Sequence, residues 1–370
     1  MTKQWCAEQA WAWYNEQPWI RGWCGYPSNC VNRIAMWQEH NHRAVAEQIA
    51  YEFALAQKTG YNAVRAVLQF EVWYHQHDSF MANLEEYFTL ADKYGIKVML
   101  VLGNDCCVPR ALYQPPKFGE QPIDWGYHSG IRRGPHAGGH TEMGYLPIDD
   151  AEYTDAHYRM VDEIAAKYAK DPRLQVWNIW NEIGNSRRGM TSVPHMEKYF
   201  EIVRSHDPIQ PLTAECWLYD DERMPYNPAE LRALELSDVI SFHCYWPLDR
   251  TVQIIENLRE TYGRPLLCTE WLHRIGNQGV EEIFPLFYLE KVGCYNWGLM
   301  QGFSQTYEPH GCFMEQIADP NYHGTAQLHL WQHDLYRFNG LPYIASEIAC
   351  IQKFAALADV RWAKQHPENA

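Results

Sequence analysis

The stretch LQVWNIWNEIG at residues 174–184 is the most informative part of the sequence. Its apolar residues between Val176 and Trp180 predict a buried β-strand. The strand ends abruptly on two polar side chains, Asn181 and Glu182, with a glycine shortly after them. An amide and a carboxylate at the carboxyl end of a strand are typical of a functional site in a parallel barrel. A barrel of this kind requires seven further strands.

The rest of the chain alternates between strand-like and helix-like patterns. The expected strands are at 18–26, 61–69, 96–105, 174–182, 211–217, 238–246, 264–271 and 292–300. Helices are expected at about 42–59, 80–94, 151–169, 194–205, 228–236, 251–262, 278–290, 326–337 and 343–364. This alternation predicts βα units and a parallel sheet. Eight strands, without a GxGxxG after the first, favour a (β/α)8 barrel of the α/β class.

We expect one domain over residues 1–370, with long βα loops and a C-terminal helix. The segment 103–150 interrupts the alternation and is rich in Gly, Pro and His. A loop of this length is usually functional or disordered, and its position after a barrel strand favours an active-site wall.

Composition and charge limit the classes of partner. Aromatic residues make up 14% of the chain, including 16 Trp and 24 Tyr, which suits both a large core and a carbohydrate cleft. The formal charge of −15 argues against a nucleic acid partner, whose phosphates would be repelled. No apolar run is long enough to span a membrane. The oligomeric state has no signature in the sequence.

Two features predict a cytoplasmic location. The first twenty residues contain several polar side chains and no continuous apolar region, so a signal peptide is not expected. The eleven cysteines include no CxxC pair, and several lie in apolar strand-like runs, as expected in a reducing compartment.

A second carboxylate is found at the end of RPLLCTE, residues 264–270. Taken singly, Glu182 or Glu270 could cap a helix or pair with an arginine. Together they lie at the carboxyl ends of the fourth and seventh strands, where both side chains point into one cleft. Paired carboxylates are what glycoside cleavage requires, one as proton donor and the other as nucleophile or base.

These motifs resemble the signatures of retaining glycoside hydrolases of clan A. The resemblance rests on Trp180-Asn181-Glu182 and Thr269-Glu270-Trp271, and it extends over nearly the whole chain. Three further motifs are similar to those of the clan: Tyr61-Asn62-Ala63-Val64-Arg65 on strand two, His243-Cys244-Tyr245 on strand six and Trp297 on strand eight. The stretches 27–37 and 266–301 also resemble bacterial cellulase-like and 1,4-β-xylanase-like proteins. Strand three departs from the clan, because Asn104 stands where many members carry a histidine.

The resemblance implies a role for each residue. Glu182 would be the acid/base, kept protonated by partial burial and by the neighbouring acid. Glu270 would be the nucleophile, ionised by Arg65 and Tyr245. Asn181 would donate to the sugar 2-hydroxyl. The two carboxyl groups of a retaining enzyme should lie about 5–5.5 Å apart.

Further residues are candidates for substrate binding, each with core packing or solvation as the alternative. His243 would bond a carboxylate or a sugar hydroxyl, and Trp297 would form the floor under the sugar. The other candidates are Asn104, Trp271, Trp73 and Trp217, with Trp125 and Trp246 as additional sugar platforms. The pairs Arg132-Arg133 and Arg187-Arg188 could clamp an anionic sugar, although surface solvation is favoured.

No metal or cofactor is expected. The loop histidines His128, His136 and His140 match no metal-binding spacing and are expected to be solvated. We therefore expect a retaining glycoside hydrolase that cleaves a β-type bond in short oligosaccharides or glycosides. The alternatives are a metal-dependent barrel enzyme of sugar metabolism and a non-catalytic carbohydrate-binding barrel.

Overall fold

The computed structural model describes residues 3–218 and 227–367. Its eight parallel strands form one sheet in the order β5-β4-β3-β2-β1-β8-β7-β6. A parallel bridge between Cys216 and Phe242 joins the two edge strands, and the His243 amide donates to the Cys216 carbonyl at 2.9 Å. The strands are β1 Arg21–Cys24, β2 Ala63–Val67, β3 Lys97–Asn104, β4 Leu174–Asn181, β5 Leu212–Thr213, β6 Ile240–His243, β7 Leu266–Trp271 and β8 Gly293–Trp297. The predicted (β/α)8 barrel is confirmed.

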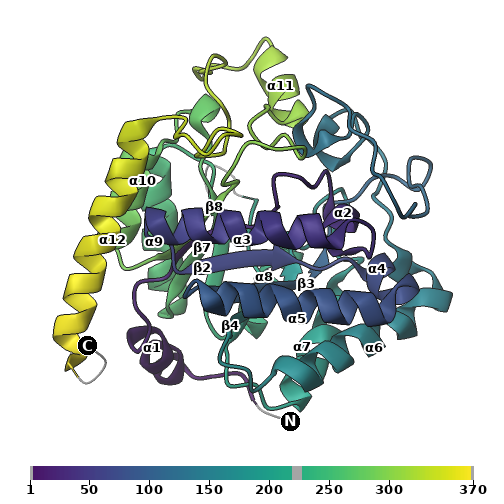
Figure 1. Ribbon diagram of the computed structural model, residues 1–370, viewed down its shortest axis with the longest axis horizontal. Helices are drawn as coiled ribbons and strands as arrows, with labels where there is room; N and C mark the ends of the chain where they lie inside the picture. Colours follow the sequence, from purple (N-terminus) through teal and green to yellow (C-terminus); the bar gives the residue numbers. More distant parts are fainter. Residues whose placement is uncertain (1–2, 219–226, 368–370) are drawn as a thin grey trace.

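The helices surround this barrel (Figure 1). They are α1 Ala7–Asn15, α2 Arg33–Trp37, α3 His42–Thr59, α4 Phe70–His75, α5 His77–Lys93, α6 Ala151–Tyr168, α7 Val193–Ser205, α8 Pro228–Leu236, α9 Leu248–Tyr262, α10 Val280–Leu289, α11 Gly311–Ala318 and α12 Ala345–Gln365. The C-terminal α12 lies along α10 at one side of the barrel. No helix within the described residues is both long and apolar enough to cross a lipid bilayer.

Two hydrophobic clusters make up the core. The larger cluster lies between the strands and the outer helices, and the smaller one fills the barrel interior. Every residue of β4 is buried, as expected for a parallel strand that is covered on both faces. The helix α1, which the sequence patterns did not predict, joins the interior cluster through Ala10 and Tyr14 and so closes one end of the barrel.

The prediction of a helix at 326–337 is wrong. This segment is irregular, and Asp334 has a positive φ of 52°. Its buried polar residues serve as partners for other loops: the carbonyls of His333 and Asp334 accept hydrogen bonds from Arg274, and Gln332 accepts one from the His310 amide. These non-local contacts hold the backbone in a non-helical path despite its local pattern.

Candidate active site

The two expected carboxylates meet at the carboxyl ends of the strands. Glu270 lies in β7, and Glu182 directly follows β4. One oxygen of each carboxylate and one ring nitrogen of His243 lie within 4.8 Å of one another. Glu182 has a positive φ of 49°, which is unusual for a residue with a side chain and marks a locally strained backbone.

Arg65 of β2 organises the floor of the site. Its side chain is fully buried and donates to Glu270 at 2.8 Å and to Glu215 at 2.6 Å. It also donates to Asn178 at 2.9 Å and to Asn181 at 2.5 Å. A buried guanidinium needs several acceptors to offset its desolvation, and here every acceptor comes from a barrel strand or a strand end.

Both oxygens of Glu270 accept hydrogen bonds. Arg65 donates to Oε1, and the Tyr245 hydroxyl donates to Oε2 at 2.8 Å. These donors favour the carboxylate form, but burial acts in the opposite direction and leaves the pKa of Glu270 above its usual value. The site thus holds the Glu270 carboxyl group in one orientation.

Glu182 has a different set of partners. His243 Nδ1 lies 2.8 Å from Oε1, the Cys106 thiol donates to Oε2 at 2.9 Å, and the Asn185 amide also donates to Oε2. Burial raises the pKa of Glu182, but the hydrogen bond and charge of His243 outweigh it and bring the pKa below the usual value. Conversely, Glu270, Glu182 and Glu215 raise the pKa of His243 to about 10 against the effect of burial.

The proton distribution of the free site therefore differs from the expected one. Glu182 was expected to be protonated, whereas the hydrogen bond and charge of His243 hold its pKa below the usual value and favour the ionised form. Burial raises the pKa of Glu270, while the charges of His243 and Arg65 and the Tyr245 hydrogen bond act against burial and favour its ionised form, as expected for a nucleophile. The physical reason is the imidazolium of His243, a partner that the sequence motif did not connect to Glu182. The proton on Nδ1 is nevertheless only one hydrogen bond away from Glu182.

Glu215 is a third carboxylate that the sequence analysis missed. It is fully buried just after β5, accepts from Asn178 Nδ2 at 2.6 Å and lies 3.1 Å from His243 Nε2. Its signal was present, because it ends the strand-like run PLTAE in the same manner as Glu182 and Glu270. Cys106 and Asn185 were also missed, since both lie in loops without a pattern.

Other predicted residues lie at the site. Asn104 ends β3 and accepts from Asn181 Nδ2 at 2.7 Å. Trp297 ends β8 half-buried, with its ring 5.8 Å from that of Tyr26. Trp217 is half-buried and donates to the Ile183 carbonyl at 3.0 Å, next to Glu182.

Trp73 and Trp271 were predicted to lie at the site, but the structure places both elsewhere. Trp73 is buried on α4, and its indole nitrogen donates to Glu163 of α6 at 2.8 Å. Trp271 is fully buried behind β7, where it packs on the rings of Phe284 and Phe287. Both expectations were wrong because these side chains point toward the outer helices. Trp125 and Trp246 are exposed, at 62% and 39%.

Two expected surface residues are buried instead. Arg188 is 1% exposed and bonds Asp105 and Asp149, so it braces the loop after β4, whereas Arg187 is exposed. His128 is 3% exposed, which contradicts its expected solvation. Arg132 and Arg133 are exposed, as expected, although both line a cavity beside the site.

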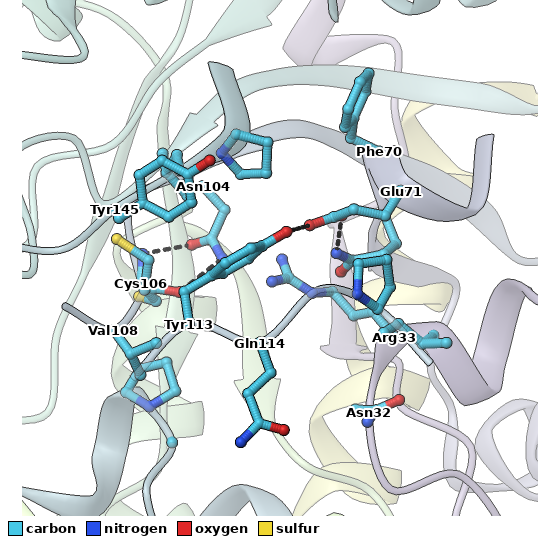
Figure 2. Close-up of a pocket in the computed structure, with 18 of the residues that line it drawn as sticks. Asn32, Arg33, Phe70, Glu71, Asn104, Cys106, Val108, Tyr113, Gln114 and Tyr145 are labelled. Carbon is cyan, nitrogen blue, oxygen red and sulfur yellow. Dashed lines mark hydrogen bonds between the residues drawn. The ribbon is translucent and has the colours of Figure 1, made fainter. Parts of the chain in front are cut away.

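This cavity has a volume of about 750 Å³ and lies beside the ends of β2, β3 and β4. Asn104 and Cys106, which contact Asn181 and Glu182, line one side, while Arg33 and Glu71 lie across from them (Figure 2). The rest of the wall comes largely from the long segment after β3, as expected for that loop. The cavity therefore lies next to Glu182, from which Cys106 separates it, and neither Glu182 nor Glu270 is among its lining residues.

Comparisons with known proteins show structures of the same fold. The chain resembles the endo-β-1,4-mannanase of Thermotoga petrophila with a TM-score of 0.56 and 15% identity, over 93% of this chain and 78% of that one. It resembles the endo-1,4-β-mannanase of Rhizomucor miehei with a TM-score of 0.55 and 11% identity, over 92% and 95%.

A third similar structure is the GH5_18 protein of Streptomyces cattleya in complex with GlcNAc, with a TM-score of 0.55 and 13% identity, over 93% and 80% of the two chains. The comparison with curated proteins gave no match. The family model described as cellulase (glycosyl hydrolase family 5) matches residues 27–282, which is more than half of the chain. The protein therefore belongs to glycosyl hydrolase family 5 and is an O-glycosyl hydrolase with a (β/α)8 barrel.

Proposed function

We propose that the protein hydrolyses a β-glycosidic bond with retention, with Glu270 as the nucleophile and Glu182 as the acid/base. The observation that carries this proposal is the short separation of the two carboxylates, whose nearest oxygens lie within 4.8 Å. Retaining enzymes hold the two groups about 5–5.5 Å apart, whereas inverting enzymes leave about 6.5–9.5 Å for a water molecule. The contacts of Arg65 and Tyr245 with Glu270 further support its role as nucleophile.

In the first step, a Glu270 oxygen attacks the anomeric carbon while the glycosidic C–O bond breaks and the leaving oxygen takes a proton from Glu182. In the second step, Glu182 removes a proton from water, which attacks the same carbon and releases Glu270. Two inversions give net retention. Asn181 is held in place by Arg65 and Asn104. In this proposal it contacts the sugar 2-hydroxyl, and this contact strengthens in the transition state.

The Glu182–His243 pair supplies the acid proton in this proposal. In the free site this proton lies on His243 Nδ1, 2.8 Å from Glu182 Oε1. Glu270 loses its negative charge when it forms the bond to the anomeric carbon. One of the carboxylates that keep His243 protonated is then neutral. Transfer of the proton across this one hydrogen bond makes Glu182 a proton donor toward the leaving group.

The roof of the site supports the proposal that the substrates are short. The cavity is bounded by the loop after β3, and this loop is bonded to the loop after β8 through Gln305, which contacts Asp124 and Gly126. Joined loops above the strand ends support short oligosaccharides or glycosides as substrates, rather than an open polymer. Because the similar structures include mannanases, β-mannosides should stand in the test panel beside β-glucosides and β-xylosides.

The proposal is tested with a panel of aryl β-glycosides and short oligosaccharides. We expect turnover by the wild type and a loss of more than about 10⁴-fold in Glu270→Ala. Glu182→Ala should lose about 10²–10⁴-fold on poor leaving groups and less on activated aryl groups, which need no proton. Glu315→Gln, at an exposed carboxylate of α11, is the control.

NMR of the first-formed product should show the β anomer. Unchanged turnover in Glu270→Ala, or a first-formed α anomer, would overturn the retaining mechanism. Saturable sugar binding without turnover of any panel member would favour a carbohydrate-binding barrel. A metal ion between the carboxylates is physically disfavoured, since it would lie beside the cations Arg65 and His243.

A further inference from the structure

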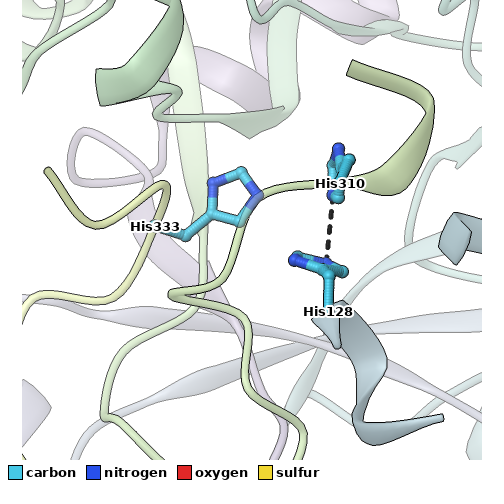
Figure 3. Close-up of side chains that lie close together, drawn as sticks. All are labelled: His128, His310 and His333. Carbon is cyan, nitrogen blue, oxygen red and sulfur yellow. Dashed lines mark hydrogen bonds between the residues drawn. The ribbon is translucent and has the colours of Figure 1, made fainter. Parts of the chain in front are cut away.

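Three histidines from distant parts of the chain meet beside the active site. His128 lies in the loop after β3, His310 directly precedes α11, and His333 lies in the irregular segment after α11. Each offers a ring nitrogen, and these three nitrogens lie within 4.8 Å of one another (Figure 3). His128 and His333 are buried, and His310 is half-buried. The cluster, named here the three-histidine cluster, has no part in the glycosidase chemistry.

The outer hydrogen bonds of the cluster fix the orientation of two rings. His128 Nδ1 lies 2.8 Å from the Glu308 carbonyl, and His333 Nδ1 bonds the Leu272 carbonyl. Because a carbonyl only accepts, both Nδ1 atoms carry the proton and both Nε2 atoms present a lone pair. Histidines that bind a metal ion have this same arrangement, with the non-ligating nitrogen donating to a carbonyl or carboxylate.

The ligands are also in the right protonation state. Burial lowers the pKa of His128, His310 and His333 well below the usual value, so all three rings are neutral at pH 7. A metal ion requires neutral imidazoles, and here only the proton between the Nε2 atoms of His310 and His128 has to move, by a change of tautomer of His310.

The spacing fits a tetrahedral ion. His128 Nε2 and His310 Nε2 lie 3.0 Å apart in a hydrogen bond that His310 donates, because the proton of His128 is on Nδ1. This distance is close to the value of about 3.3 Å between two nitrogens bound to tetrahedral zinc at about 2.0–2.1 Å, and an ion would replace the hydrogen bond once the proton of His310 moves to Nδ1. His333 Nε2 now accepts from the Gln332 amide at 3.0 Å, and a cation would replace this hydrogen bond. His273 adds a further nitrogen at the edge of the cluster: it is 8% exposed, and its Nε2 has no hydrogen-bond partner within the described residues.

We propose that His128, His310 and His333 form a binding site for one divalent transition-metal ion of the zinc class. Neutral imidazoles suit zinc and the neighbouring late transition metals and do not suit magnesium or calcium. The ion joins the loop after β3 to the segments on both sides of α11. Its position also matters for the active site, because the rings of His310 and His333 lie 6.3 and 5.6 Å from that of Tyr245, which holds Glu270.

The test is a titration of EDTA-treated, dialysed protein with Co²⁺ and Zn²⁺. We expect one Co²⁺ per chain with the visible absorption bands of a four-coordinate ion, their displacement by Zn²⁺, and a rise in melting temperature with Zn²⁺. His310→Gln, at the half-buried ligand, should weaken binding by at least about 100-fold. The control His323→Gln removes an exposed histidine of the segment after α11 and should bind as the wild type does.

Several outcomes would overturn the proposal. These are the absence of saturable Co²⁺ binding to the wild type, several weak ions per chain, or equal binding by His310→Gln and the wild type. The wild-type titration decides the question even if a variant fails to fold. Glu270→Ala separates this site from the carboxylate pair: metal binding should persist in this variant, and its loss there would assign the ion to the catalytic centre instead.

Discussion

At the scale of single residues, the contact between His243 and Glu182 determines how the acid proton is held. His243 also faces Glu215 at 3.1 Å and Glu270 at 3.5 Å, so one imidazole serves three buried carboxylates. Groups coupled this closely titrate together, and the proton belongs to the Glu182–His243 pair as a unit. The pair as a whole, rather than Glu182 alone, is the general acid in our proposal.

Replacing His243 should therefore change the pH dependence of catalysis. The wild-type pair keeps its proton until the pH approaches the His243 pKa of about 10. In His243→Gln the proton must reside on Glu182 alone, whose usual pKa of 4.5 is raised by burial and lowered by the Cys106 hydrogen bond. The alkaline limb of the kcat/KM profile should move to lower pH by more than about one unit.

The control for this profile is His206→Gln, which alters a histidine that pairs with Asp162 among the outer helices. Its alkaline limb should coincide with that of the wild type. If His243→Gln lowers kcat/KM by a constant factor at every pH, His243 only orients Glu182 and does not carry the acid proton.

At the scale of elements, the segment after β4 is held in place by a buried ion pair. Asp105, just after β3, accepts from Arg188 at 3.2 Å, from Ser192 at 2.6 Å and from the Gly184 amide at 2.7 Å. These bonds span the residues that follow Glu182. They offset the strain of the positive φ of Glu182, because Asp105 at the end of β3 holds the backbone that follows Glu182 in place.

Arg188→Met should destabilise this segment. It leaves Asp105 buried without its cationic partner, which should lower the free energy of unfolding by about 3 kcal/mol. Chemical denaturation measures this loss, and kcat should fall with it, since Glu182 loses its support. Arg187→Met is the matched control, because the neighbouring side chain is exposed. Equal stability of the two variants would show that the ion pair contributes nothing.

The individual helices and strands differ in how well the sequence predicts them and the residues they carry. The strands and the ends that carry Glu182 and Glu270 follow from local patterns, an apolar run followed by a polar residue. Local patterns do not show which face of a helix or strand carries a tryptophan side chain. The predicted positions of Trp73 and Trp271 at the site were wrong for this reason. The three-histidine cluster could not be predicted at all, because its members come from loops that are brought together only by the closed barrel.

At the scale of the whole molecule, several carboxyl groups outside the catalytic pair are buried. Glu52 on α3 accepts from the Ser28 amide, Glu230 on α8 accepts from backbone amides near Trp217, and Asp334 accepts from Thr306. Burial raises the pKa of each of these three carboxyl groups to about 7. A protein with a formal charge of −15 thus also carries internal acids that favour the protonated form.

These acids should make the protein less stable as the pH rises through neutrality. Their folded-state pKa values of about 7 exceed the usual 4.5 and 3.8, so their stabilisation is complete below about pH 4 and is lost as the pH rises through 7. Melting temperature should fall from about pH 5.5 to pH 8, with about 1–3 kcal/mol lost per group. Glu52→Gln keeps the acceptor oxygen without the charge and should flatten part of this dependence, whereas Glu47→Gln, exposed on the same helix, should not. A wild-type melting temperature that rises over this range would contradict the assignment, because it would mean that these carboxyl groups are ionised and well paired in the folded protein.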